Sequence, residues 1–195
     1  MASKSNLQID ESTLPRLAGI LNTRILELIL LPTEKCNFRC TYCYEDFEMG
    51  RMSPEIILGI KNLILNRAND LDRLQLSWFG GEPLAALDVV LEVSGFAAQL
   101  AAKKSHLNYR AHMTTNASLL DPATFDKLVD VGVLDYQITL DGPREIHNQT
   151  RVQAGGGGTF DRIWNNLLAI RATNLPASIH LRIHFDSETA YRMGP

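Results

Sequence analysis

Cysteine is scarce in this chain of 195 residues, and none follows Cys43. The three that are present, Cys36, Cys40 and Cys43, fall within one short segment. A disulfide framework requires an even number of cysteines, spread widely enough to join distant segments, so this pattern argues against one. Thiols that lie this close together are suited to bind metal. The sequence therefore predicts a metal site between residues 36 and 43.

Strong charge and long apolar runs are also missing. The net charge is −3, and this near balance gives no electrostatic reason to expect nucleic acid or an anionic membrane as a partner. No apolar run of the length of a membrane span stands out, and residues 1–11 lack the apolar centre of a secretion signal. We therefore expect a cytoplasmic protein that binds neither nucleic acid nor a membrane.

From residue 25 onward, short apolar segments alternate with amphipathic ones. This alternation predicts βαβ units and an α/β fold with a parallel sheet, although it does not separate an open sheet from a full or partial barrel. The first apolar segment is suited to a buried strand. Residues 1–24 are expected to form an N-terminal extension, and residues 25–195 the core. The predicted strands cover residues 25–31, 74–79, 109–115, 136–140 and 179–185.

Capping residues mark the helices between these strands. Ser53 before Pro54 and Asp121 before Pro122 each place an N-cap ahead of a proline at the first helical position, and Gly132 is suited to end the second of these helices. Thr159 is the expected N-cap of the last helix, and another helix is expected over residues 87–103. The predicted buried faces comprise Ile56, Ile57, Ile60, Leu63 and Ile64, then Phe125, Leu128 and Val129, and then Phe160, Ile163, Trp164, Leu167 and Leu168.

Unusual residues follow four successive predicted strands. The cysteine segment follows the first strand, residues 80–83 (GGEP) follow the second, residues 114–116 (TTN) end the third, and residues 141–143 (DGP) follow the fourth. The carboxyl ends of parallel strands meet at one edge, where both barrels and open α/β sheets assemble their sites. We therefore expect these four segments to form one site.

Three thiolates with the spacing of Cys36, Cys40 and Cys43 can hold three corners of a cubane cluster and leave the fourth iron open. The segment resembles the C-x3-C-x-Φ-C signature of the radical S-adenosylmethionine (radical SAM) superfamily, with Tyr42 at the aromatic position. This resemblance implies a [4Fe–4S] cluster whose open iron is chelated by S-adenosylmethionine, and a 5′-deoxyadenosyl radical that abstracts a substrate hydrogen. A zinc site with one of the five histidines as fourth ligand is the alternative interpretation, and His147 is the nearest of them in a plausible loop.

The second motif, Gly80-Gly81-Glu82-Pro83, resembles the segment with which the same superfamily binds the amino group of the methionine moiety. Two glycines permit a close approach of the backbone, and the carboxylate of Glu82 is an acceptor for an ammonium group. Alone, the motif is a common turn. Its position one βα unit after the cysteines favours a role in binding the cofactor.

The third motif runs from Thr139 and Asp141 through His147 to Arg151. It resembles a stretch of the anaerobic sulfatase-maturase and peptide-maturase branch of the superfamily, with Thr139 in place of the usual Ser and Asn148 where Asp is frequent. The glycine run 155–158 before Thr159 resembles a further segment of that branch. The resemblance implies that Thr139 and Asp141 contact the cofactor or the substrate.

Two further residues are candidates for binding the cofactor. Asn116 follows the third strand, where it can reach a ligand or occupy a left-handed turn, which Asn tolerates. On the fifth strand His180, Arg182 and His184 share one face. If this face lines the interior of a barrel, Arg182 can pair with the cofactor carboxylate. Arg39 can offset the charge of the cluster or lie exposed.

The resemblance implies a partial (β/α) barrel of six units, of which five strands are recognisable, so the barrel is expected to be truncated. The branch also carries a C-terminal cysteine-rich domain (SPASM), which has no counterpart among these cysteines. The implied activity is modification of a peptide or protein side chain, with an electron donor such as flavodoxin or ferredoxin. A small-molecule substrate is an alternative, as is a truncated chain that binds a cluster or zinc without turnover.

Overall fold

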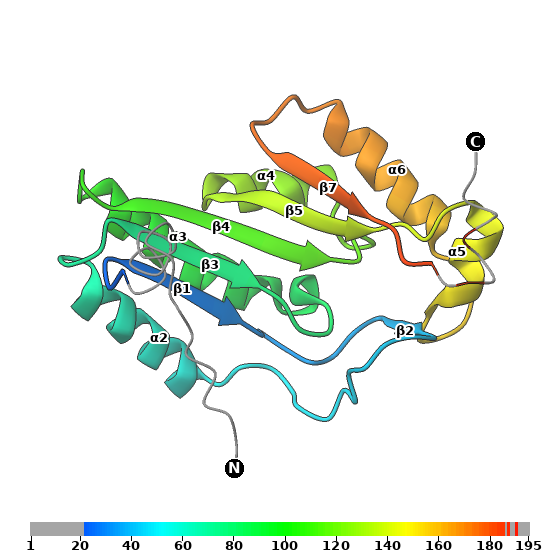
Figure 1. Cartoon of the computed structure of the whole chain (residues 1–195), viewed down its shortest axis with the longest axis horizontal. Helices are drawn as coiled ribbons and strands as arrows, with labels where there is room; N and C mark the ends of the chain where they lie inside the picture. Colours follow the sequence, from blue (N-terminus) through cyan, green and yellow to red (C-terminus); the bar gives the residue numbers. More distant parts are fainter. Residues whose placement is uncertain (1–21, 186, 188–189, 191–195) are drawn as a thin grey trace, which may run out of the picture.

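Five parallel strands form the central sheet of the protein (Figure 1). The computed structural model describes residues 22–185, 187 and 190. The sheet has the order β1-β3-β4-β5-β7, so each strand lies beside the preceding one in the chain. This order confirms the predicted α/β fold and its parallel sheet. The strands are β1 (Ile25–Leu30), β3 (Arg73–Trp78), β4 (Asn108–Thr115), β5 (Val133–Thr139) and β7 (Ser178–Arg182).

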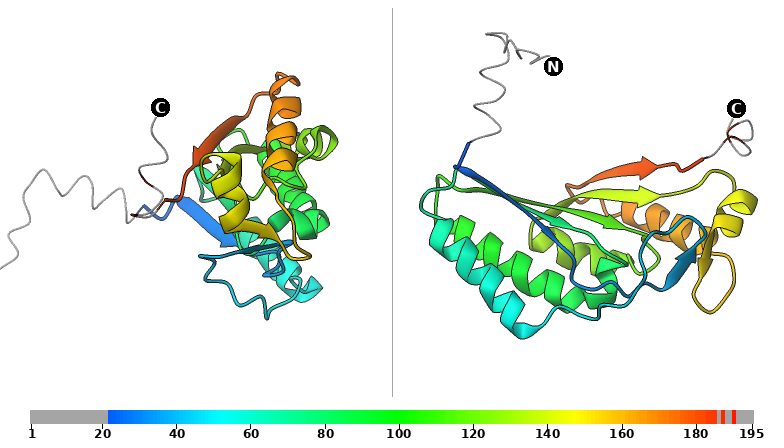
Figure 2. Two further views of the ribbon diagram at one scale, coloured as in Figure 1. Left: turned by 90° about the vertical axis from the view of Figure 1, so that its right-hand side faces the viewer. Right: turned by 60° about the horizontal axis from the view of Figure 1, so that its bottom comes forward.

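The helices that connect these strands cover one face of the sheet (Figures 1 and 2). Along each strand, successive side chains point to opposite faces of the sheet. On the helix-covered face, Leu74, Leu76 and Trp78 of β3 are fully buried. The Nε1–H of Trp78 donates to the hydroxyl of Ser94 at 3.0 Å, which satisfies the polar atom of the largest core side chain. The covering helices are α2 (Pro54–Arg67), α3 (Leu87–Ala102), α4 (Pro122–Asp130) and α6 (Phe160–Arg171).

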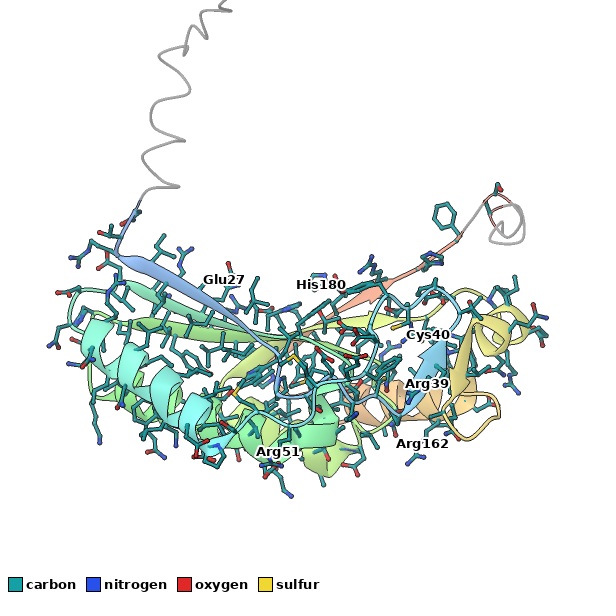
Figure 3. All side chains as sticks on the ribbon, turned by 90° about the horizontal axis from the view of Figure 1, so that it is seen from below. Glu27, Arg39, Cys40, Arg51, Arg162 and His180 are labelled. Atoms are coloured by element: carbon teal, nitrogen blue, oxygen red, sulfur yellow. The ribbon has the colours of Figure 1, made fainter. Side chains whose placement is uncertain are left out.

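The opposite face of the sheet, here called the inner face, carries no helix in the described part of the chain (Figure 2). Figure 3 shows the side chains of Glu27 and His180 pointing away from the helices on this face. The expectation of a buried first strand is therefore wrong for one face of β1: Ile25 and Ile29 are exposed, while Leu30 is buried. The mostly apolar sequence of β1 does not reveal that only one of its faces is covered.

Helix α2 begins where the capping residues predicted, because the hydroxyl of Ser53 accepts from the backbone N–H of Ile56 at 3.4 Å. Its buried residues are Ile57 and Ile64, whereas Ile56 and Leu63 are exposed. The predicted face was thus too wide. Similarly, Trp164 and Leu168 of α6 are largely exposed, and Ile163 and Ile170 are its buried residues.

The predicted N-cap of the last helix is at the right residue, Thr159, but its side chain does not make the hydrogen bond of a cap. Its hydroxyl donates instead to the backbone carbonyl of Arg151 at 2.5 Å. The side chain of Asn148 accepts from the N–H groups of Thr159 and Phe160, at 2.8 and 3.0 Å. Asn148, which precedes the helix by more than ten residues, therefore satisfies these N–H groups at the start of α6.

Sequence patterns missed three short elements: β2 (Phe38–Cys40), α5 (Arg144–Thr150) and β6 (Arg151–Gln153). Strands β2 and β6 pair antiparallel and form a ribbon outside the main sheet. Each has only three residues, too few for a period of two to be recognised. The 3-10 helix η1 (Pro83–Ala86) between β3 and α3 was also not predicted.

By length and composition, one helical stretch within the described residues, Pro83–Ala102, could cross a membrane. This corrects the expectation that the chain holds no such run. Val89, Val90 and Val93 of this stretch are fully buried against the sheet, and a core helix of this kind passes the same test. Most of the predicted N-terminal extension lies outside the described residues.

Neighbouring residues of α2 test the assignment of its buried face. Ile64 is completely buried, so Ile64→Ala is expected to lower the free energy of unfolding by about 2–5 kcal/mol. Leu63→Ala is the matched control, with an expected loss below about 1 kcal/mol because its side chain is exposed. Urea unfolding of both variants measures the difference, and equal losses would contradict the assignment.

Candidate functional site

A pocket of about 290 Å³ opens at the carboxyl edge of the sheet. Its walls come from the ends of β3, β4, β5 and β7, from the ribbon and from the cysteine segment that follows β1. It contains the three cysteines and most of the predicted site residues. The residues that line it include Cys36, Cys40, Tyr42, Cys43, Gly80, Gly81, Asn116, Thr139, Arg151, Arg182 and His184.

The ribbon of β2 and β6 holds the cysteine segment in place. Cys40 lies opposite Arg151 in the antiparallel pair. The N–H of Thr41 donates to the carbonyl of Thr150 at 2.9 Å, and the N–H of Ala154 donates to the carbonyl of Asn37, also at 2.9 Å. The third sequence motif therefore pairs directly with the first through backbone hydrogen bonds.

The three thiols line one pocket, and three thiolates can hold three corners of a cubane cluster. Within the described residues, no group of three His, Cys, Asp or Glu side chains lies close enough together to hold a single metal ion. Burial raises the pKa of Cys36 to about 11, and burial also raises that of Cys40, so binding iron has to displace thiol protons.

The alternative of a zinc site with His147 is wrong in this structure. His147 is fully buried and does not line the pocket. Its Nδ1 accepts from the N–H of Asp141 at 3.2 Å, and its Nε2 lies 3.0 Å from the hydroxyl of Thr159. Both ring nitrogens therefore have hydrogen-bond partners within the protein. Through them His147 connects the third motif to the start of α6.

The two glycines of the second motif are required by close contact with the backbone of residues 33–35, directly before the cysteine segment. A Cβ on Gly81 would lie 2.1 Å from the carbonyl oxygen of Glu34, and Gly80 has a φ of +104°. The N–H of Gly81 donates to the carbonyl of Thr33 at 3.2 Å. Side chains here would push the two segments apart. Both glycines also line the pocket.

Glu82 lies behind the pocket wall and does not line it. Its buried carboxylate accepts from the N–H of Leu84 (3.0 Å), the hydroxyl of Thr115 (2.7 Å) and the N–H of Asn116 (2.8 Å). Burial raises the pKa of this carboxyl group, and these hydrogen bonds oppose the shift. In this structure Glu82 joins the ends of β3 and β4, and its predicted contact with an ammonium group remains a prediction. Pro83, the first residue of η1, is buried and is likewise absent from the pocket wall.

Asn116 lies in the pocket wall and points toward the cysteine segment. Its Nδ2 donates to Asn37 Oδ1 at 2.9 Å and lies 3.8 Å from the sulfur of Cys36. The left-handed conformation proposed for this turn belongs to the next residue, Ala117, with a φ of 59°. Thr139, at the end of β5, also lines the pocket.

Asp141 lies behind the pocket wall and holds two residues of that wall in place by hydrogen bonds. It is buried, and its Oδ2 accepts from the hydroxyl of Tyr42 at 2.6 Å and from that of Thr150 at 3.1 Å. Its Oδ1 accepts from the N–H of His184 at 3.1 Å. The ring of Tyr42 stacks on that of His184, with 3.9 Å between centroids. Asp141 thus fixes two wall residues, and its predicted contact with a ligand remains a prediction.

The predicted last strand was too long, because β7 ends at Arg182 and His184 lies beyond it. Arg182 and His184 both line the pocket, whereas His180 on β7 does not. Arg39 is exposed, and its guanidinium lies over the ring of Phe47, 4.2 Å from the centroid. Sequence reasoning assigned no role to Arg151 or to the stacking of His184. The position of Arg151 in the third motif was the one signal that could have found it.

Comparisons with known proteins identify the family. A model of the Radical SAM superfamily matches residues 30–190, and the chain belongs to this superfamily. This superfamily binds a [4Fe–4S] cluster and S-adenosylmethionine, so the predicted class of cofactors is confirmed. The match also confirms that the α/β sheet is a partial barrel of the radical SAM type.

Two curated relatives modify peptides or proteins, as their names state. A cysteine-type anaerobic sulfatase-maturating enzyme of Clostridium perfringens is 28% identical over 149 residues, which make up 71% of this chain and 39% of that protein. A PqqA peptide cyclase of Gluconobacter oxydans is 25% identical over 159 residues, 82% of this chain and 42% of that protein. The similarity thus falls in the predicted maturase branch.

A solved structure agrees with this placement. The maturating enzyme anSMEcpe with bound AdoMet and Cp18Cys peptide superimposes with a TM-score of 0.73 at 25% identity, covering 86% of this chain and 45% of that one. The chain spans less than half the length of these three relatives.

Glu82→Gln tests the structural role of this buried carboxylate in the chain without any cofactor. The amide NH₂ of Gln cannot accept from the N–H of Asn116, so the free energy of unfolding is expected to fall by about 1–3 kcal/mol. Urea unfolding measures this loss. Unchanged stability would contradict this structural role.

The buried His147 predicts a dependence of stability on pH. Burial, and next the charge of Arg151, lower its pKa from 6.5 to about 4. The unfolded chain therefore binds a proton at higher pH than the folded one, and stability is lost as the pH falls from 6.5 to about 4, by on the order of 3 kcal/mol. Unfolding free energies measured across this range in wild type and His147→Asn test it; the same slope in both would contradict this assignment.

Proposed function

We propose that this chain is the cofactor-binding part of a radical SAM enzyme that abstracts a hydrogen atom from a side chain of a peptide or protein substrate. The observation that carries this proposal is the pocket in which Cys36, Cys40 and Cys43 face Gly80 and Gly81 at the carboxyl edge of the sheet. When bound, the cluster and S-adenosylmethionine supply a 5′-deoxyadenosyl radical, the species that abstracts the hydrogen.

Residues of the chain have distinct roles in this proposal. The three cysteines hold the cluster, and the backbone at Gly80 and Gly81 offers polar groups to the methionine moiety. Asn116, Thr139 and the exposed Arg182 offer further polar contacts along the same wall. Tyr42, fixed by Asp141, forms the side of the pocket next to Cys43.

Two observations support a peptide or protein as the substrate. Two of the curated relatives are named as a sulfatase-maturating enzyme and a peptide cyclase. The inner face next to the pocket is open in the described part of the chain and carries mainly polar side chains, with further hollows whose linings include Glu27, Gln75 and His112. An extended peptide has the polar backbone that such a surface can bind. The proposal includes a cytoplasmic location and an electron donor of the flavodoxin or ferredoxin class.

Anaerobic reconstitution tests the proposed function. The chain is loaded with iron and sulfide, iron and absorbance are measured, and dithionite and S-adenosylmethionine are added to detect 5′-deoxyadenosine. We expect about four irons per chain and cleavage of the cofactor. Cys40→Ala is expected to abolish assembly of the cluster, because two thiolates hold a cubane poorly. Leu63→Ala, remote from the pocket, is the control and should assemble normally.

Each contrary outcome has a specific meaning. A chain that binds zinc and no cluster would overturn the assignment to radical chemistry. A cluster that never cleaves the cofactor would favour a binding fragment without turnover. Hydrogen transfer from a small metabolite, with none from any peptide offered, would instead support the small-molecule alternative.

A further inference from the structure

Strand β1 forms one edge of the sheet, and within the described residues no further strand pairs with its outer side (Figure 1). Its sequence, ILELIL, holds neither the lysine nor the proline that often protects an edge strand from pairing with another chain. Ile25 and Ile29 are exposed on its inner face. An apolar edge strand of this kind is a template for any extended chain that reaches it. Some segment is therefore expected to cover this edge.

The contacts of β1 with β3 show which backbone groups face this edge. The carbonyls of Arg24 and Leu30 accept hydrogen bonds from N–H groups of β3 and of the residue after it, at 3.2 and 2.9 Å. Successive residues of a strand direct their N–H and C=O groups to opposite sides, so the even-numbered residues of β1 bind β3. The N–H and C=O groups of Glu27 and Ile29 therefore point to the open edge.

The chain makes a tight turn directly before β1. The N–H of Ile25 donates to the carbonyl of Asn22 at 3.3 Å, and the side-chain Oδ1 of Asn22 accepts from the N–H of Arg24 at 2.9 Å. The first of these bonds closes a β-turn, and Asn at the first position is a common way to stabilise one. The guanidinium of Arg24 pairs with Asp72 at 2.6 Å and holds the turn against the start of β3. This turn directs the chain that precedes it back along β1.

We propose that residues 17–21 (LAGIL) form a further strand that pairs antiparallel with β1 and covers this edge. The two-residue loop of the turn fixes the register of the pairing. Ile20 lies opposite Glu27, and two residues farther along Ala18 lies opposite Ile29. Glu27 and Ile29 are the β1 residues whose N–H and C=O groups point outward. The turn and the open edge, two separate observations, therefore specify the same pairing.

Apolar side chains of this segment match an uncovered side of α2. The Nη2 of Arg67 donates to the carbonyl of Thr23 at 2.6 Å, so the side of α2 that carries Arg67 lies toward the edge of β1. Ile56 lies on the same side of the helix, about three turns earlier, and is 53% exposed. Leu17 and Leu21 lie opposite even-numbered residues of β1, whose side chains pack against the core, and partners across an antiparallel pair share a face. The pairing therefore buries apolar side chains and also satisfies the backbone.

Amide hydrogen exchange of the full chain, followed residue by residue by NMR, tests the pairing. In an edge strand only alternate N–H groups reach the neighbouring strand. We therefore expect the N–H groups of Ala18 and Ile20 to exchange at least about tenfold more slowly than in an unpaired chain. The N–H groups of Leu17, Gly19 and Leu21 point to solvent and are expected to exchange at the unpaired rate. This alternation distinguishes a strand from a helix, in which consecutive N–H groups are protected.

Two proline variants of neighbouring residues test the register. Ile20→Pro removes the N–H that donates to the carbonyl of Glu27, so exchange at Glu27 and Ile29 is expected to become about tenfold faster than in wild type. Gly19→Pro is the matched control. Its N–H faces solvent in this register, and an edge strand tolerates proline at such a position, so exchange at Glu27 and Ile29 is expected to stay slow. The same exchange rates in both variants would overturn the register.

The remaining outcomes assign the edge to another occupant or to none. Slow exchange at every residue from 17 to 21 would indicate a helix and overturn the proposed strand. Fast exchange at residues 17–21, with protection of Glu27 and Ile29 that rises with protein concentration, would assign the edge to a second copy of the chain and would also overturn it. Fast exchange at all of these residues would show an open edge, with the same consequence. None of these measurements requires the cluster, so each of these results leaves the proposed function untouched.

Discussion

The antiparallel pairing of β2 with β6 is the constraint on which the site depends. The cysteine segment leaves the main sheet after β1 and would otherwise be a long loop. Backbone hydrogen bonds to residues 150–154 give it a fixed position, and Asp141, Tyr42 and Arg151 reinforce the same contact with side chains. The position of the three cysteines is therefore set by residues 150–154, which lie more than a hundred residues later in the chain.

The opposite wall is fixed by a different kind of contact. Gly80 and Gly81 let the turn after β3 lie directly against the backbone of residues 33–35, at a distance that no side chain would permit. Glu82 then locks this turn to the end of β4 through three hydrogen bonds. The cysteine segment is therefore held between two walls, one through strand pairing and the other through close backbone packing.

The sheet presents two chemically distinct faces. The helix-covered face carries the apolar core, and the inner face carries mainly polar and charged side chains, among them Glu27 and His180 (Figure 3), together with the exposed Ile25 and Ile29. A surface of this kind suits a polar, extended ligand better than an apolar one. At the last strand, Leu181 remains exposed and lines an apolar groove with Trp164 and Leu168 of α6. The predicted buried face of α6 was wrong at those two helix residues for this reason: nothing in the described part of the chain covers them.

The sequence by itself determined the alternation of strands and helices, the starts of α2 and α4, and the gathering of motifs at one edge of the sheet. These features follow from local periodicity, from capping residues and from the rule that parallel strands end together. Tertiary structure decided which residues at that edge face the pocket. Glu82 and Asp141 lie behind the wall and Arg151 lies in it, because hydrogen bonds between segments remote in sequence set the direction of each side chain. No local pattern encodes those partners, so only the folded chain shows that a buried cation stands beside Cys40.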